Sequence, residues 1–418
     1  MQDTASRCRL CLYLFLVYTG LVCAIAVAPA QPFQENWLLS SPRLTGDWGG
    51  ARTSLEDRGI RFSLFYVHFY GHKNNGGLSP TGFGAHSGSV DLFGQFDFDK
   101  MGVIRGGEAL IHLKNNWSRN INPRIGALGD PIDDADGHHG IYIDQLWYQQ
   151  SSPNDKLQIR AGYLDQQTIL DRNEFANAED LQFMNTYLDN NNAIIPLAIG
   201  PGVAVFYNAT DWLSFVVTAS DAESRPPTFS FATAFDGDLE YFTYFETDLK
   251  AHLSSPNGPL TGNYRFGVFL DPRNRSRFTD SSLDRQNEGF YVSFDQMVYG
   301  EPEGDDQGLG LFFRYGRRPG AVNRIAHFWS AGAQYEGLLP FADHQTIGFG
   351  MYSAIGSEDY RRFVDPNFER ETAYEVYYSA QLTPAFALAP GVQYVEHPGA
   401  LNSRAGVWVA ALRARVSF

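Results

Sequence analysis

Cysteine is nearly absent from this chain, and its three copies all lie close to the N-terminus. Cys8, Cys11 and Cys23 are the only cysteines among 418 residues. If the first 30 residues are removed, the remaining chain has no disulfide framework, no thiolate metal site and no cysteine nucleophile. This absence suits a protein that is exported through an oxidising compartment.

Basic residues are in short supply as well. The sequence has 32 Lys and Arg against 47 Asp and Glu. Removal of residues 1–30 takes away two arginines and one aspartate, so 30 basic and 46 acidic residues remain and the formal net charge is −16. Because phosphate contacts need a basic surface, this balance argues against a nucleic-acid partner.

Long apolar runs are confined to the N-terminus. Residues 10–28 (LCLYLFLVYTGLVCAIAVA) carry no charge, follow two arginines and end at Ala28-Pro29-Ala30. This pattern predicts a signal peptide over residues 1–30, with Gln31 as the first mature residue. An uncleaved anchor is the alternative, but no positive residues follow the run to hold it. No later stretch approaches the ~20 apolar residues of a membrane helix, so any membrane crossing would use strands.

Catalytic signatures are missing too. The sequence contains no GxSxG elbow, no HExxH helix and no P-loop, and its serines and histidines are scattered. The chain is therefore predicted not to be an enzyme, and neither a cofactor nor a metal is expected. A membrane-embedded hydrolase with a converging Ser, His and Asn or Asp is the enzymatic alternative, and it is much less favoured.

The sequence does contain strong period-two alternation. In the last strand, alternate residues from Trp408 to Phe418 are apolar, while Arg413 and Arg415 lie on the opposite face. A terminal strand with an aromatic last residue, an apolar face and a polar face is typical of outer-membrane barrels. Sixteen candidate strands have comparable patterns: 61–70, 88–99, 107–116, 141–150, 156–165, 199–207, 211–219, 239–253, 262–270, 288–299, 308–316, 326–337, 344–355, 371–382, 385–396 and 404–418.

The connections between these strands alternate in length. Short turns occur near 99–106, 151–155, 208–210, 254–260, 338–344 and 383–385, and longer segments, such as 117–140 and 166–198, lie between them. Short turns at one rim and long loops at the other are the plan of an outer-membrane barrel. The predicted fold is therefore all-β, a 16-stranded antiparallel transmembrane β-barrel over residues 61–418. A secreted all-β binding protein is the soluble alternative.

Residues 31–60 are predicted to form a short N-terminal periplasmic helical segment that lies at the barrel mouth or plugs it. Asp47 is a plausible helix cap, ARTSLEDR a two-turn helix and Gly59 its stop. The same segment carries a family resemblance. LTGDWGGARTSLEDRGI (44–60) resembles the opening signature of the carbohydrate-selective porin family (OprB type).

Three further stretches fit that family in the expected order. They are IDQLWYQ (143–149), LQIRAGYLDQQTILD (157–171) and QYVEHPGA (393–400), where PGA stands in place of the family's PGG. The resemblance covers essentially the whole mature chain. It implies a sixteen-stranded barrel through which sugars diffuse, with arginines, acids and aromatics at a constriction.

Polar residues in the inward phase of the strands are candidates for the pore lining. Sugars present hydroxyls that donate and accept hydrogen bonds, so charged and aromatic side chains can replace their hydration shell in weak, successive steps. For any one position a solvated wall residue is the simpler interpretation, whereas the set as a whole is interpreted as pore lining. The residues expected to line the pore or contact substrate are Asp91, Gln95, Asp97, Glu108, Lys114, Asn116, Arg160, Asp165, Arg172, Arg314, Arg413 and Arg415.

Two long loops invite separate hypotheses. The loop 129–140 gathers four aspartates and two histidines, but its spacing matches no EF-hand, so a solvated acidic loop is favoured over a calcium or zinc site. The loop 166–198 mixes polar residues with Phe175, Phe183 and Tyr187. It is expected either to fold into the lumen and narrow it or to form a lid on the outer rim.

These observations predict an outer-membrane porin of a Gram-negative bacterium that passes mono- or small oligosaccharides by diffusion. An anion-selective pore based on Arg160, Arg314, Arg413 and Arg415, or a general diffusion porin, is the alternative. The expected partners are carbohydrate solutes, outer-membrane lipid and lipopolysaccharide, and the assembly machinery that recognises the C-terminal strand. The sequence leaves open whether the protein is a monomer or a homotrimer.

Overall fold

The computed structural model describes residues 41–135, 137–191, 193–196, 198–236, 240–285, 287–302, 307–338 and 345–418. The predicted signal peptide at 1–30 and the residues from 31 to 40 lie outside the described part. In the described part, no helix has the length and apolar character needed to cross a membrane.

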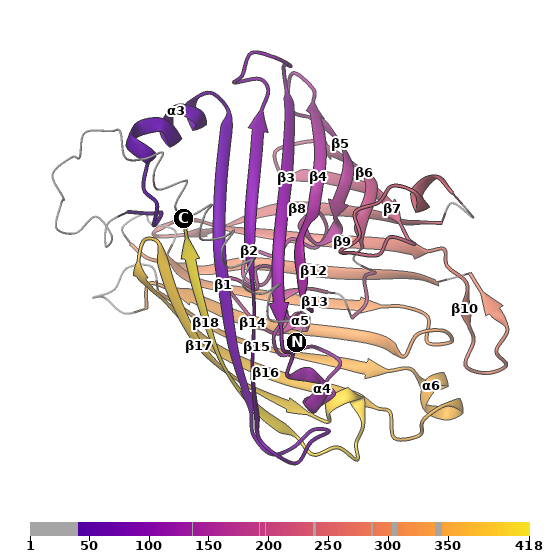
Figure 1. The fold of residues 1–418 in the computed structure, drawn as a ribbon. Helices are drawn as coiled ribbons and strands as arrows, with labels where there is room; N and C mark the ends of the chain where they lie inside the picture. Colours follow the sequence, from indigo (N-terminus) through magenta and orange to yellow (C-terminus); the bar gives the residue numbers. More distant parts are fainter. Residues whose placement is uncertain are drawn as a thin grey trace, which may run out of the picture.

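Sixteen antiparallel strands form a closed barrel, and each strand pairs with its neighbours along the chain (Figure 1). The barrel closes where β1 pairs with β18, from Phe65 opposite Ser417 to Lys73 opposite Val409. The predicted fold class and strand number are thus confirmed. The barrel strands are β1 (Ile60–Lys73), β2 (Phe83–Asp97), β3 (Gly107–Ser118), β4 (His139–Ser151), β5 (Leu157–Asp165), β6 (Ile199–Asn208), β7 (Leu213–Asp221), β8 (Tyr241–Ser255), β9 (Gly258–Asp271), β12 (Asn287–Gly300), β13 (Gly308–Arg317), β14 (Ile325–Glu336), β15 (Gln345–Gly356), β16 (Arg370–Thr383), β17 (Phe386–Glu396) and β18 (Val407–Ser417).

The remaining elements are short and lie in the connections. A two-stranded hairpin, β10 (Arg275–Ser276) with β11 (Leu283–Asp284), occupies the loop between β9 and β12. The helical pieces are η1 (Trp48–Gly50), α3 (Ala51–Asp57), α4 (Asn122–Ile125), η2 (Gln166–Thr168), α5 (Thr186–Asp189), η3 (Thr233–Phe235), α6 (Glu358–Phe363) and η4 (Pro398–Ala400). The long loops emerge at the rim opposite the start of β1 and the end of β18, as the alternation of connection lengths predicts.

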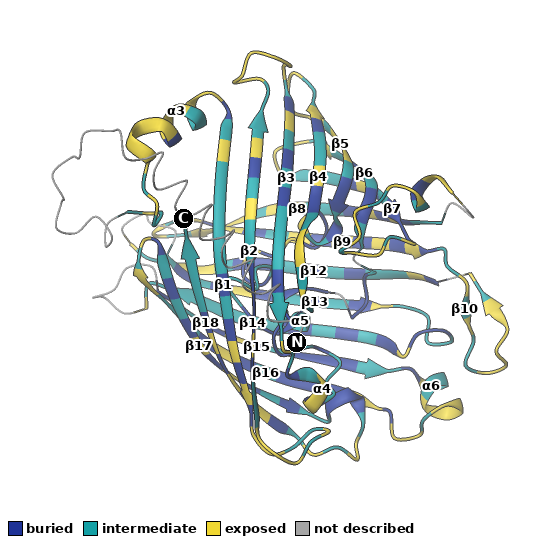
Figure 2. Ribbon diagram, viewed as in Figure 1, coloured by how far each residue is buried: buried dark blue, intermediate teal, exposed yellow. Residues whose placement is uncertain are grey.

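More buried and more exposed residues alternate along the strands (Figure 2), and many large apolar side chains lie on the exposed face while many polar ones are buried. On β18, Trp408 and Leu412 are 53% and 39% exposed, whereas Arg413, which directly follows Leu412, is 2% exposed. An apolar outside and a polar inside are what a strand needs when lipid covers one face and water or protein the other. The two faces therefore follow the phase that the sequence predicts.

The N-terminal segment binds to the end of β18, close to the place where β1 and β18 close the barrel. The Leu44 amide donates to the Ser417 carbonyl at 2.7 Å, and the buried Arg52 guanidinium donates to the carbonyls of Gly46 and Phe418 at 2.9 and 3.0 Å. The helix α3 thus lies against the end of the chain at the short-turn rim (Figure 1). The described part of this segment is therefore held at the rim through Leu44 and Arg52.

The helix boundaries differ slightly from the expectation. Gly50, not Asp47, precedes α3, and the side chain of Asp47 reaches into the helix by accepting from the amide of Thr53 at 2.9 Å. Gly59 follows the helix with a φ of 87° and lets the chain turn into β1, because only glycine adopts that backbone region without strain.

Replacement of Arg52 by methionine is expected to weaken this fastening. The change removes the donors to two carbonyls, so the free energy of unfolding should fall by about 1–3 kcal/mol. Loss of the compact, SDS-resistant form during heating measures the effect. Arg58→Met, an exposed change in the same segment, is the control. Equal unfolding temperatures for the two variants would contradict the role given to Arg52.

Candidate functional site

The loop 166–198 lies inside the barrel. Its Phe183 side chain is fully buried and packs edge-on against Phe312 of β13 and Tyr377 of β16, with ring centroids 5.5 and 5.1 Å apart. Tyr187 of α5 packs in the same way against Phe328 and Tyr352. Of the two expectations for this loop, the fold into the lumen is therefore the one observed.

Glycines on the inner wall make room for the loop. A Cβ atom at Gly310 of β13 would lie 2.1 Å from the ring of Phe175, and one at Gly350 of β15 would lie 2.8 Å from the ring of Phe183. Contacts this short leave no space for any side chain at these positions. The absence of side chains on the wall thus determines where the aromatic residues of the loop can sit.

Two inward-facing arginines hold the backbone of the loop. Arg314 donates to the carbonyls of Leu188 and Ala176, and its Nε lies 3.0 Å from Oδ2 of Asp171. Arg413 donates to the carbonyls of Glu179, Leu181 and Gln182 at 2.6–2.8 Å. Loop carbonyls inside a barrel need such donors, because an unpaired buried polar group is costly.

Inward-facing glutamates satisfy the loop amides in the same manner. Glu375 of β16 accepts from the amides of Met184 and Asn185 at 2.8 and 3.1 Å, and Glu246 of β8 accepts from the amide of Asp171 at 2.8 Å. Glu371 of β16 accepts from Leu128, Gly129 and Gly399 and so holds two further loops. The sequence reading missed these three glutamates, although each lies in the inward phase of its strand.

The expectation that Arg314 and Arg413 line the pore is not met. Their side chains face inward, but they are 0% and 2% exposed because the loop covers them. Asp97 lies at the end of β2, where its Oδ1 accepts from the amide of Lys100 at 3.0 Å. The two arginines thus hold the loop in place and do not face a solute path in this structure.

Four of the expected residues line one cavity of about 780 Å³ between the loop and the wall of β2 to β5, namely Asp91, Lys114, Asn116 and Asp165. His112 of β3 joins its two neighbouring strands, because its ring nitrogens lie 2.8 Å from Asp91 of β2 and 3.0 Å from Asp144 of β4. The ring of Phe93 stacks on it at 3.9 Å. This part of the cavity is thus lined with charged groups that are paired with one another.

Arg160 of β5 forms a second polar cluster on the same wall. Its guanidinium donates from Nε and Nη2 to Oε1 of Gln149 at 3.1 and 3.0 Å and lies 3.9 Å from the ring centre of Trp147. The side-chain amide of Gln149 in turn donates a hydrogen bond to Oε2 of Glu108 at 3.5 Å. This row joins three neighbouring strands and presents a planar cation above an aromatic face.

The other expected residues lie apart. Gln95 is exposed on the inner face of β2, and Arg172 is exposed on the loop. Arg415 pairs with Asp180 of the loop at 2.7 Å and lies 4.2 Å from the ring centre of Phe65. The structure therefore brings some of the predicted set together and distributes the rest over the loop and the turns.

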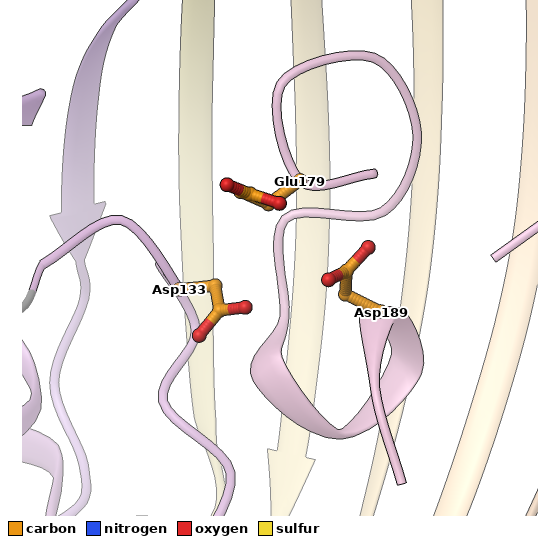
Figure 3. A group of neighbouring side chains, drawn as sticks. All are labelled: Asp133, Glu179 and Asp189. Atoms are coloured by element: carbon orange, nitrogen blue, oxygen red, sulfur yellow. The ribbon is translucent and has the colours of Figure 1, made fainter. Parts of the chain in front are cut away.

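Residues 129–135 of the loop 129–140 are packed into the barrel, so the interpretation as a solvated acidic loop is wrong for this part, whereas His138 and Gly140 are exposed. Asp134 is 4% exposed and lies 3.1 Å from Nζ of Lys114, and Asp133 accepts from the hydroxyl of Thr186 at 2.8 Å. Asp136 lies outside the described residues. One oxygen each of Asp133, Glu179 and Asp189 lies within 4.8 Å of the others, so the two loops meet at a group of carboxylates (Figure 3).

Comparison with known proteins places these features in a family. A putative porin, QuiX, of Acinetobacter baylyi is 22% identical over 446 residues, which cover 96% of this chain and 98% of the relative. Porin B of Pseudomonas aeruginosa is 22% identical over 445 residues, which cover 96% and 95%. The high-pH structure of OprB from Pseudomonas putida has the same fold, with a TM-score of 0.80 and 21% identity over 91% of this chain and 100% of that one.

Residues 84–418 match the family described as "Carbohydrate-selective porin, OprB family". The match begins after the 44–60 segment, so that segment lies outside it. The match nevertheless spans most of the chain and all but the first of its barrel strands. The chain therefore belongs to the OprB family of carbohydrate-selective porins.

Proposed function

We propose that this porin lets mono- or small oligosaccharides diffuse through the space between the loop 166–198 and the wall of β2 to β5. The observation that carries the proposal is the cavity of about 780 Å³, which is lined on the wall by Asp91, Lys114 and Asn116. Its donors and acceptors match sugar hydroxyls, and weak, exchangeable contacts permit passage. The guanidinium of Arg160 above Trp147 supplies a planar donor group beside an aromatic ring.

The same geometry bears on the anion-selective alternative. That reading depends on four arginines, of which Arg314 and Arg413 are engaged by loop carbonyls and Arg415 is paired with Asp180. The cavity is also lined by many carboxylates. These contacts reduce the support for anion selectivity, so we favour passage of neutral sugars.

The cellular setting is part of the proposal. We infer that residues 1–30 are removed as a signal peptide during export and that the segment 31–60 lies on the periplasmic side. The barrel would contact outer-membrane lipid and lipopolysaccharide through its apolar face and reach the membrane through the assembly machinery that reads its C-terminal strand. Monomeric and homotrimeric arrangements are both compatible with this proposal.

Replacement of Arg160 tests the proposed contact with sugar. In planar bilayers, glucose should reduce the single-channel conductance of the wild type, and Arg160→Ala should need roughly tenfold more glucose for the same block, which corresponds to the loss of one charged hydrogen-bond group. Arg160→Lys keeps the charge but loses the planar pair of donors and should be intermediate. Identical glucose titrations for all three proteins would remove Arg160 from the sugar path.

A further inference from the structure

Three carboxylates from two different loops converge inside the barrel. Asp133 belongs to the loop between β3 and β4, whereas Glu179 and Asp189 belong to the loop between β5 and β6 (Figure 3). One oxygen of each lies within 4.8 Å of the other two. The residues that bring them together are the wall anchors described above, since Arg413 holds the carbonyl of Glu179 and Arg314 that of Leu188.

Buried polar atoms at this place lack partners among the described residues. Asp189 is 1% exposed, and although its Oδ2 accepts from the side-chain amide of Asn190, its Oδ1 accepts no hydrogen bond. Asn116, which lines the same cavity and is 2% exposed, has no partner for either amide atom. A buried carboxylate oxygen without a donor is costly unless a positive charge lies next to it.

Cations of the protein lie near this place, and their shortest ion pairs are with other carboxylates. Lys114 forms an ion pair with Asp134 at 3.1 Å, and Arg415 forms one with Asp180. Arg314 forms an ion pair with Asp171 and donates to the loop carbonyls. Carboxylates this close together repel one another when they are ionised, and Lys114 and Arg314, which act on Glu179 and Asp189, relieve that repulsion only in part.

We propose that Asp133, Glu179 and Asp189 bind one calcium ion, which ties the loop 119–138 to the loop 166–198. Calcium takes oxygen ligands at about 2.3–2.6 Å, so the oxygens around one ion lie within about 5 Å of one another, as they do here. Magnesium demands a shorter, nearly octahedral arrangement and keeps more of its waters. The group contains no imidazole or thiolate, which transition metals would favour.

Calcium at this site would fix the positions of the two loops that border the pore. Both loops border the cavity that the proposed function assigns to solutes, so an ion between them would hold the two sides of the passage together. Calcium binding is independent of sugar passage, and the two proposals can fail separately.

The experiment uses the full mature chain, refolded in detergent without lipopolysaccharide so that no lipid-bound calcium contributes. After treatment with EDTA, calcium is titrated by isothermal calorimetry, and thermal unfolding is followed with and without the ion. We expect one ion per chain and a higher unfolding temperature with calcium. Asp133→Asn combined with Glu179→Gln should weaken binding by about tenfold or more, since even the outer partners of metal ligands have effects of this size.

Glu174→Gln is the matched control, because Glu174 is exposed on the same loop and lies outside the group. It should bind calcium like the wild type. The isosteric amides relieve repulsion, so the double variant is expected to remain folded, and its SDS-resistant band verifies this. Absence of binding to the wild type, unchanged binding in the folded double variant, or magnesium affinity equal to that for calcium would each overturn the proposal.

Discussion

Replacement of Arg314 by methionine should widen the pore and raise its single-channel conductance severalfold. The arginine is fully buried and holds the loop 166–198 at Leu188, Ala176 and Asp171. Without its guanidinium, the carbonyls lose their donors and the Asp171 carboxylate loses its ion pair. Removal of one partner of a buried pair costs about 3–5 kcal/mol, which is enough to release the loop from the wall.

Conductance in planar bilayers measures this effect, and passage of larger oligosaccharides in liposome swelling should increase with it. Arg317→Met on the same strand is the control, because Arg317 is exposed at the end of β13. Its conductance should equal that of the wild type. A folded Arg314→Met protein with wild-type conductance and size limit would show that the loop does not depend on this anchor.

Introduction of arginine at Val376 should prevent stable insertion into the membrane. Val376 is 46% exposed on the outside of β16, and its cross-strand neighbours Phe349 and Val392 are 47% and 48% exposed. This apolar row is what lipid would contact. A charged residue near the middle of the lipid face costs about 2–4 kcal/mol, a large part of the stability of a folded barrel.

The folded fraction after mixing with liposomes, read from the SDS-resistant band, reports this cost. Val376→Leu keeps the apolar surface and should insert like the wild type. If the Val376→Arg barrel inserted with the same yield, the face assigned to lipid would be wrong.

Much of the fold is readable from the sequence because its signals are local. Alternation places Leu412 outside and Arg413 inside from the residues of one strand alone, and the structure agrees with that phase. The strand ranges expected at 107–116 and 308–316 become Gly107–Ser118 and Gly308–Arg317. Turn residues and strand periodicity act over a few positions, so no distant part of the chain is needed to recognise them.

The site was predicted less well, because the outcome depends on contacts between distant parts of the chain. Arg314 faces inward as expected, but its partner carbonyl at Leu188 is 126 residues away in sequence. Which inward residues the loop covers cannot be read from their own strands. For the same reason Glu375 was overlooked, since an inward glutamate looks like pore lining until the amides of Met184 and Asn185 are placed on it.

The most direct test is the conductance of the wild-type channel during titration with a panel of sugars. A polar passage between the loop 166–198 and the wall of β2 to β5 predicts stable channels whose ion current falls saturably as glucose is added. It also predicts that larger oligosaccharides block more weakly or fail to pass. Channels that conduct ions but respond equally to all solutes of one size, or not at all to glucose, would contradict the assignment as a sugar-selective pore.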